Sequence, residues 1–222
     1  MIDVSCFVGP GPLTSVSTPD SLEALLRAEG VVRAAVSPMP ALFGGPEFPL
    51  PSSDFFTPVP IVEPGAEFSA DGPAVRVRTA RGAEAVKRAC GAAGLVFILQ
   101  LRVADPRNVP AELGLADVTL PDALALARAE PGVPMIVAGA RVPELDAILA
   151  AAPSSVFAEL SLAEQPDVVR RAVRTHGAHR LLMGTHAPFL TPAAARMKLA
   201  AARLSPAEHA AVSYRNAEAL GF

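Results

Sequence analysis

Short runs of Val, Ile, Leu and Phe alternate along the chain with longer segments rich in Ala, Leu, Glu and Arg. The first kind has the length of a β-strand, and the second has the period of an amphipathic helix. The pattern predicts strands at residues 1–8, 31–36, 59–62, 74–78, 95–103, 133–138, 155–161 and 180–184. It predicts helices at residues 21–27, 83–92, 121–129, 143–151, 166–175, 192–202 and 206–220.

Repeated strand–helix units indicate an α/β protein with a parallel sheet, and eight such strands favour a compact (β/α)8 TIM-like barrel. The 222 residues are close to the lower size limit of that fold, roughly 200 residues, so we expect a single barrel domain over residues 1–222. Residues 37–73 are rich in proline, and the helices after strands 2 and 3 are predicted to be shortened or missing. An open, doubly wound sheet is the alternative.

The segment 37–58 carries Phe43, Phe48, Phe55 and Phe56 among its prolines. On a barrel, a loop after a strand lies over the C-terminal mouth, where such long loops are often functional. The segment is therefore either a lid over a site or a stiff cover that packs its phenylalanines on the barrel rim.

Composition narrows the class of protein. Apolar residues make up 51% of the chain and charged residues 18%, which is typical of a folded globular protein. The net charge of -3 and the lack of a basic stripe argue against a nucleic-acid partner. No apolar run approaches the roughly 18 residues of a membrane-spanning helix, and the first residues do not resemble a signal peptide. We therefore expect a cytoplasmic location and no membrane partner.

Few residues of this chain suit a metal or a cofactor. Cys6 and Cys90 are too few for a disulfide framework or a zinc site. All four histidines lie in the last quarter, which excludes a histidine-rich centre assembled from the whole chain. No phosphate-binding loop, dinucleotide fingerprint or nucleophile elbow is present, so we expect no cofactor.

Polar side chains occupy one face of several strands that should otherwise be apolar. On the first strand, for example, Ser5 shares the face of Asp3 and Phe7 and opposes Val4, Cys6 and Val8. Because active sites of this fold lie at the C-terminal ends of the strands, these residues predict a polar cup at the barrel mouth. The candidate residues of this cup are Ser5, Arg76, Arg78, Gln100, Arg102, Glu159 and His186.

Two interpretations of the cup remain open. It is a pocket for a small anionic molecule, with arginines as clamps for carboxylate or phosphate, or it is an internal salt-bridge network such as Arg102 with Glu159. His186 is either a general acid or base tuned by Glu159, or a hydrogen-bonded structural residue.

Several segments resemble one known superfamily. IDVSCFVG at residues 2–9 resembles the opening strand of the amidohydrolase-related metal-dependent hydrolases, I-D-x-H-x-H-x-G. VFAELS at 156–161 resembles their seventh strand, and RLLMGTHAPF at 180–189 resembles their closing strand, R-x-L-F-G-S-D-x-P. NAEALG at 216–221 is similar to the end of their final helix. The resemblance implies a hydrolase built on a (β/α)8 barrel.

The metal ligands of that family are not retained. The positions of its ligands fall at Ser5, Phe7 and His186, and near Gln100 and Gly139. Serine, phenylalanine and glycine side chains do not hold a divalent ion, so we expect no metal and no metal-activated water. The residues that distinguish this branch within the resemblance are Gln100, Arg102, Asp105, Arg107 and His186.

Three functions follow as hypotheses. The first is a metal-independent or degenerate hydrolase of a small anionic substrate, with His186 and Glu159 as catalytic residues and Arg76 and Arg102 as anion clamps. The second is a non-catalytic barrel that binds a small ligand, and the third is a metal-dependent hydrolase with unconventional ligands such as His186 and Glu159. The Ala/Leu-rich outer helices also allow a homodimer.

Overall fold

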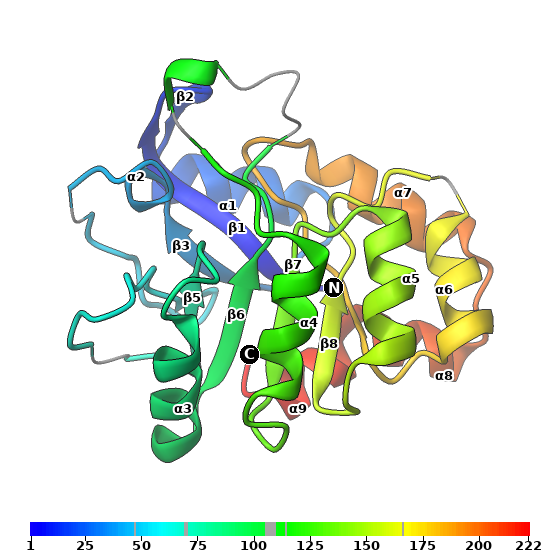
Figure 1. Cartoon of the computed structure of the whole chain (residues 1–222). Coiled ribbons are helices and arrows are strands. Elements are labelled where there is room, and N and C mark those ends of the chain that lie inside the picture. The colour runs from blue at the N-terminus through cyan, green and yellow to red at the C-terminus, as the bar shows by residue number, and fades with distance from the viewer. Residues whose placement is uncertain (47, 69–70, 105–109, 114, 166) are drawn as a thin grey trace.

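The computed structural model describes residues 1–222 except 47, 69–70, 105–109, 114 and 166 (Figure 1). The strands are β1 (Ile2–Gly11), β2 (Thr14–Ser17), β3 (Arg33–Pro38), β4 (Phe56–Pro58), β5 (Ala74–Val77), β6 (Val96–Gln100), β7 (Met135–Ala138), β8 (Val156–Glu159) and β9 (Leu181–Leu182). The α-helices are α1 (Pro19–Ala28), α2 (Met39–Leu42), α3 (Ala83–Ala93), α4 (Leu120–Arg128), α5 (Val142–Ala151), α6 (Val168–His176), α7 (Pro192–Ala201), α8 (Pro206–Ala210) and α9 (Asn216–Ala219). A 3-10 turn, η2 (Ala111–Leu113), and a π-helical segment, η3 (Ala211–Arg215), complete the description.

The strands form two sheets of orders β2-β1-β3-β4 and β5-β6-β7-β8-β9. All pairings within them are parallel except that of β1 with β2. Backbone hydrogen bonds join the two sheets at both edges. Beyond β4, the Val62 N–H donates to the Arg76 carbonyl at 2.8 Å, and beyond β9 the His186 N–H donates to the Ser5 carbonyl at 2.7 Å. The fold is therefore the compact TIM-like α/β barrel predicted from the sequence.

The connections after β3 and β4 are short of helix, as predicted. β3 is followed by α2, which has four residues, and the described residues between β4 and β5 hold no helix. Phe55 and Phe56 are buried in one cluster with Leu22 and Leu26 of α1. This part of the proline-rich segment therefore packs on the barrel as a cover.

The C-terminal segment differs from its prediction. Residues 206–220 form α8, the π-helical η3 and α9 in succession instead of one regular helix. At the start of α9, the Asn216 side chain donates hydrogen bonds to the carbonyls of Ala178 at 2.7 Å and Leu181 at 2.9 Å, which ties the end of the chain to β9. Within the described ranges, no helix has the length and apolar character needed to cross a membrane.

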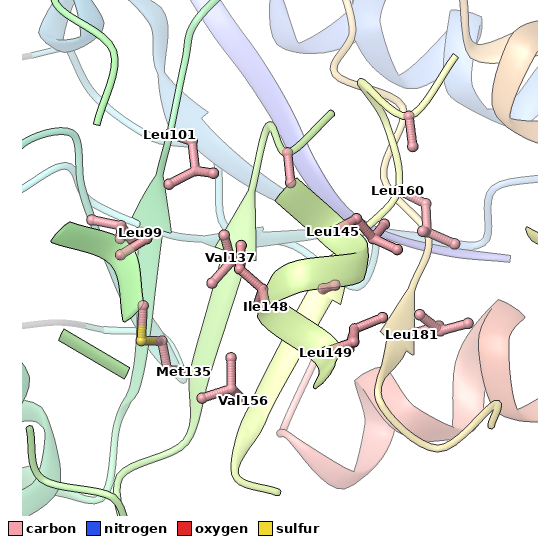
Figure 2. Packing of buried hydrophobic residues seen from close by; sticks show 14 of the residues in the cluster. Leu99, Leu101, Met135, Val137, Leu145, Ile148, Leu149, Val156, Leu160 and Leu181 are labelled. Carbon is pink, nitrogen blue, oxygen red and sulfur yellow. The ribbon is translucent and has the colours of Figure 1, made fainter. Parts of the chain in front are cut away.

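The largest hydrophobic cluster lies between the second sheet and the helices that cover it. Figure 2 shows Leu99, Val137 and Val156 from neighbouring strands beside Leu145 and Ile148 of α5. Side chains that alternate with these residues point into the barrel, because successive residues of a strand face opposite ways. The inward residues therefore decide what the barrel contains.

The base of the barrel interior is apolar. A second cluster there includes Ile98, Ile136 and Leu182 of the strands and is completed by Phe222 at the end of the described chain. In β6 the inward residue that follows Ile98 is Gln100, and in β5 the inward residue that follows Ala74 is Arg76. On β5 and β6 the interior thus changes from apolar to polar between one inward-facing residue and the next, toward the C-terminal ends of the strands.

The predicted alternation along β1 is wrong at its start. The pairing of β1 with β3 shifts register between Asp3 and Cys6. Val4 packs in the apolar base of the barrel, whereas Cys6 and Val8 pack in the cluster that includes α1. A bulge changes which face successive residues occupy, so Val4 and Cys6 do not share one face as strict alternation requires.

Candidate functional site

A layer of buried polar side chains lies above the apolar base, inside the C-terminal ends of the strands. We call it the polar layer. Each of its side chains has an exposure of 1% or less. The members are Ser5, Ser37, Arg76, Gln100 and Glu159. The sequence predicted four of these residues and missed Ser37 as a site residue.

Arg76 is at the centre of the polar layer. Its Nε donates to Ser37 Oγ at 3.0 Å, and its Nη1 donates to Ser5 Oγ at 3.4 Å and to Gln100 Oε1. Its Nη2 donates to the Val4 carbonyl at 3.3 Å. Burial lowers the pKa of the guanidinium to about 10, so it remains charged at neutral pH. Within the described residues, no carboxylate lies within 4.0 Å of this cation, which is held by neutral acceptors.

Asp3 connects the first strand to the last. Its carboxylate accepts hydrogen bonds from the Ser5 N–H at 2.9 Å and the Thr185 N–H at 3.0 Å, and also from the Thr185 hydroxyl. Burial raises the pKa of Asp3, while these hydrogen bonds and the charge of Arg76 oppose that rise. An aspartate on an otherwise apolar strand was the available signal, but its partner Thr185 is 182 residues away in the sequence.

Glu159 closes the opposite side of the polar layer. It accepts hydrogen bonds from the Ser161 N–H, from the Ser161 hydroxyl at 2.7 Å and from the Gly139 N–H at 3.3 Å. Burial raises its pKa, which the hydrogen bonds from Ser161 and the charge of Lys198 oppose. A Cβ at Gly184 would lie 2.1 Å from Glu159 Oε1, so glycine is required beside this carboxylate. His186 is not among its described contacts, so the tuning of His186 by Glu159 stays a prediction.

Arg102 forms an ion-pair network at the edge of the barrel mouth. Its Nη1 and Nη2 each donate to the Glu144 carboxylate at 2.6 Å, its Nε donates to Asp117 Oδ2 at 3.1 Å, and Nη1 also donates to the Gly139 carbonyl at 2.8 Å. The partner of Arg102 in this network is thus Glu144 of α5, not the Glu159 suggested by the salt-bridge interpretation. Such a bidentate pair fixes the guanidinium in the plane of the carboxylate.

Of the remaining predicted ligand-binding residues, Arg78 is the one that the structure describes. Arg78 is half-buried on the rim, where its Nε donates to Glu63 Oε1 at 3.2 Å. Asp105 and Arg107 lie outside the described residues. The structure therefore brings together Ser5, Arg76, Gln100 and Glu159 and places Arg78 and Arg102 nearer the surface.

His186 has an unusual local geometry. Its backbone has a φ of 56°, a left-handed conformation that few residues other than glycine adopt. Its Nε2 lies 2.5 Å from the Val103 carbonyl oxygen, which can only accept a hydrogen bond, so we assign the ring proton to Nε2. Nδ1 is buried and has no hydrogen-bond partner among the described residues. Burial, assisted by the charge of Arg76, lowers the pKa to about 4, so the imidazole is neutral and Nδ1 carries a free lone pair.

An apolar cover separates the polar layer from solvent. It consists of Phe7, Met39, Leu42 and Val103, with Phe43, Ile61, Leu115 and Phe189 packed against them. The Phe7 ring contacts both the Arg76 guanidinium and the His186 imidazole. Its centroid lies 5.2 Å from the guanidinium carbon of Arg76 and 5.0 Å from the His186 ring centroid. Phe7 thus links His186 to the polar layer.

These donors do not fit the divalent metal ion that the family resemblance implies. Ser5 Oγ and Gln100 Oε1 accept hydrogen bonds from Arg76, and Phe7 offers no donor atom. A metal ion there would be repelled by the guanidinium in a medium of low dielectric constant. In the part of the chain that the structure describes, no group of three or more His, Cys, Asp or Glu side chains comes together to hold a metal.

Two hollows lie on the barrel rim and share Glu63. The first has a volume of about 640 Å³ and is lined mainly by apolar side chains, among them Phe48, Leu50 and Ile61. The second has a volume of about 630 Å³ and is lined by charged side chains. We call the second one the charged hollow, and its lining residues are Glu63, Arg78, Thr79, Ala80, Arg81, Ala116, Asp117, Val118 and Asp122. These hollows are accessible, whereas the polar layer is covered.

Comparison with solved structures supports the fold. The chain is similar to 2,6-dihydroxybenzoate decarboxylase from Rhizobium, with a TM-score of 0.72 and 15% identity over 99% of this chain and 97% of that one. It is also similar to a putative 2-pyrone-4,6-dicarboxylic acid hydrolase from Pseudomonas putida, with a TM-score of 0.66 and 16% identity over 99% and 96% of the two chains.

A third similar structure is amidohydrolase 2 from Bifidobacterium longum subsp. infantis, with a TM-score of 0.64 and 19% identity over 99% of this chain and 97% of that one. A scan against protein-family models and a search of curated proteins found no match. At these identities the likeness concerns the fold. The chain therefore has the fold of amidohydrolase-like barrels, as the sequence motifs indicated.

Proposed function

We propose that this protein is an amidohydrolase-like barrel that acts on a small molecule with an anionic group and does so without a metal ion. The observation that carries the proposal is the pairing of a fixed cation, Arg76, with a neutral imidazole, His186, whose Nδ1 has no described partner. A metal-dependent hydrolase obtains its positive charge and its activated water from the ion. Here Arg76 would supply the charge and His186 the base.

The reaction class that suits these groups is hydrolysis of an ester or lactone. His186 Nδ1 would take a proton from water as the water oxygen forms a bond to the carbonyl carbon. The bond from that carbon to the leaving oxygen then breaks, and the same proton passes from Nδ1 to the leaving oxygen. The product is a carboxylic acid, and the positive field of Arg76 would favour the negative charge that develops on the carbonyl oxygen.

Access to His186 requires the apolar cover to open. The imidazole is fully buried, and the partly buried Phe189 ring lies 5.3 Å from its centroid. Because Phe189 is partly exposed whereas Phe7 is fully buried, Phe189 is the neighbouring ring that we propose moves to expose the imidazole. Loops over a barrel mouth commonly provide such gating.

The names of two similar structures support an anionic substrate. One is a 2,6-dihydroxybenzoate decarboxylase and the other a putative 2-pyrone-4,6-dicarboxylic acid hydrolase, and both names contain a carboxylated compound. Carboxylates are also the groups that arginine recognises best. In this chain, Arg78 and Arg81 line the charged hollow on the rim. Arg78 pairs with Glu63 through Nε, and no partner of the Arg81 guanidinium is found among the described residues.

A second function is a barrel that binds its ligand without catalysis. The observation that favours it is the completeness of the polar layer, in which Arg76 and Glu159 both have several partners within the barrel. A hydrogen-bonded layer of this kind stabilises the interior with no ligand present. In this case, the lone pair of His186 would have no catalytic role.

The two functions are separated by turnover in a His186→Asn variant. Asparagine tolerates the left-handed backbone and cannot act as a base near neutral pH. Hydrolysis of a panel of carboxylated lactones and phenyl esters would be measured for the wild type, for His186→Asn and for a His209→Asn control on α8. We expect the His186 variant to lose kcat by about a hundredfold and to keep its KM. Equal turnover in His186→Asn would refute the catalytic role, and carboxylate binding with no turnover of any probe would favour the second function.

A further inference from the structure

The charged hollow carries opposite charges on its two sides. One side is the connection from β5 to α3, which supplies Arg78 and Arg81. The other side is formed by Asp117, in the connection from β6 to α4, and by Asp122, in the first turn of α4. β5 and β6 are neighbours in the second sheet, so both connections leave the barrel on the same rim (Figure 1).

The arginine side has unused donors. The Nε of Arg78 pairs with Glu63, and no hydrogen bond of its two Nη atoms is described. The Arg81 guanidinium has no described partner, while its backbone N–H donates to the Thr79 hydroxyl at 3.3 Å. An arginine has five N–H donors in a planar fork that matches a carboxylate. This side can therefore bind an anionic group.

The aspartate side has unused acceptors. Asp117 Oδ2 accepts a hydrogen bond from Arg102, and Asp122 Oδ2 accepts one from the Thr119 hydroxyl at 2.7 Å. No partner is described for Oδ1 of either residue. Asp122 lies in the first turn of α4, whose positive dipole end is near its carboxylate. This side can therefore bind a cationic group.

The two sides are not paired with each other. Among the described residues, no nitrogen of Arg78 or Arg81 lies within 4.0 Å of a carboxylate oxygen of Asp117 or Asp122. Each aspartate is anchored on its own side, Asp117 by Arg102 and Asp122 by the cap of α4. The hollow of about 630 Å³ thus separates charges of opposite sign that a ligand could bridge.

We propose that the charged hollow binds a zwitterion, a small molecule with an anionic group at one end and a protonated amine at the other. A purely anionic ligand would pair with the arginines but would face the carboxylates of Asp117 and Asp122, with that of Glu63 already paired to Arg78. A purely cationic ligand would pair with the aspartates but would face the two arginines. Only a ligand with both charges pairs with both sides. The inference rests on the proposed function in one respect, namely that the ligand carries an anionic group.

The test uses a series of ω-amino acids, from glycine to 8-aminooctanoate, with the fatty acid and the alkylamine of matching length. Binding to the wild-type protein is measured by isothermal titration calorimetry at pH 7. We expect one chain length to bind best, and to bind at least about tenfold more tightly than either matched compound. Equal affinity for the fatty acid at every length, or no binding of any ω-amino acid at millimolar concentration, would overturn the proposal.

Two variants assign the two charges. Arg81→Gln is expected to weaken binding of the best ω-amino acid about tenfold and to leave the matched alkylamine unaffected or better bound. Asp122→Asn, which keeps an acceptor for Thr119, is expected to weaken the same ω-amino acid and to spare the fatty acid. Arg27→Gln on α1 is the control, since Arg27 contacts Glu23 and the Phe55 ring and is not among the residues that line the charged hollow.

If each variant weakened binding of the ω-amino acid, the fatty acid and the alkylamine by the same factor, the assignment of charges would be contradicted. Failure of the zwitterion proposal is distinguishable from failure of the proposed function, because neither Arg81→Gln nor Asp122→Asn changes His186. If the zwitterion preference fails, catalysis by His186 remains testable, and if His186→Asn retains full turnover, the binding preference of the hollow is unaffected.

Discussion

Replacing Arg76 with methionine is expected to lower the free energy of unfolding by about 3–5 kcal/mol. Methionine is the apolar side chain closest in shape, but it donates no hydrogen bond. Ser5, Ser37 and Gln100 would each lose a partner in the buried interior of the barrel. The buried carboxylates of Asp3 and Glu159 would also lose their favourable interaction with the charge of Arg76.

Urea denaturation measures this effect, with Arg78→Met as the matched control. Arg78 follows Arg76 by two residues, just past the end of β5, but its described partner is Glu63 on the surface. Exposed ion pairs contribute about 0–1 kcal/mol to stability. We expect the control to stay within about 1 kcal/mol of the wild type. If Arg76→Met were equally mild, the polar layer would not depend on its cation.

Lowering the pH from 7 to 4.5 is expected to destabilise the wild type by about 2–3 kcal/mol more than it destabilises His186→Asn. The cause is that burial lowers the pKa of His186 from 6.5 to about 4 in the folded protein. As the pH falls below 6.5, the unfolded chain takes up a proton at this residue that the folded chain does not. Stability linked to His186 is therefore present above pH 6.5 and is lost as the pH falls toward 4.

Thermal or urea unfolding of both proteins at several pH values measures this difference. Burial raises the pKa of Asp3 and Glu159, so these groups act in the opposite direction, but they are present in both proteins. Their contribution therefore cancels in the comparison. Parallel stability profiles for the wild type and His186→Asn would show that the imidazole is hydrated or paired when folded, against the geometry described above.

The fold was predictable because two periodic patterns alternate without ambiguity along most of the chain. Each strand–helix pair gives its own local signal, as in Ala83–Ala93 followed by Val96–Gln100. The shortage of helix in the proline-rich region was also predictable, because proline removes a backbone hydrogen-bond donor. The division of the last helix had no such signal, because residues 206–220 have helical composition throughout.

Some members of the polar layer were predictable from the sequence, and the partners of the polar side chains were less so. Period-two alternation correctly grouped Arg76 with Gln100 as inward residues of β5 and β6. The bulge in β1 changes the face of Val4 relative to Cys6, so the alternation rule fails there. It could not be predicted, because a register shift leaves no signal in a single sequence. The pairing of Arg102 with Glu144 depends on how α5 packs against the rim, which local patterns do not determine.

The burial of the polar layer could not be predicted either. Phe7, Met39, Leu42 and Val103 come from separate parts of the sequence and meet only in the folded barrel. Each alone is an ordinary apolar residue near the end of a strand or in a short helix. Together they turn an expected open cup into an enclosed layer, and they move the accessible hollows to the rim.

The most direct test of the central proposal, that this barrel acts without a metal ion and relies on the charge of Arg76, is the metal content of the protein. The chain would be expressed in medium supplemented with zinc and manganese, analysed by elemental mass spectrometry, and melted with and without EDTA. We predict far less than stoichiometric metal and the same Tm in both melts. A stoichiometric ion whose removal by EDTA lowers the Tm would contradict the account.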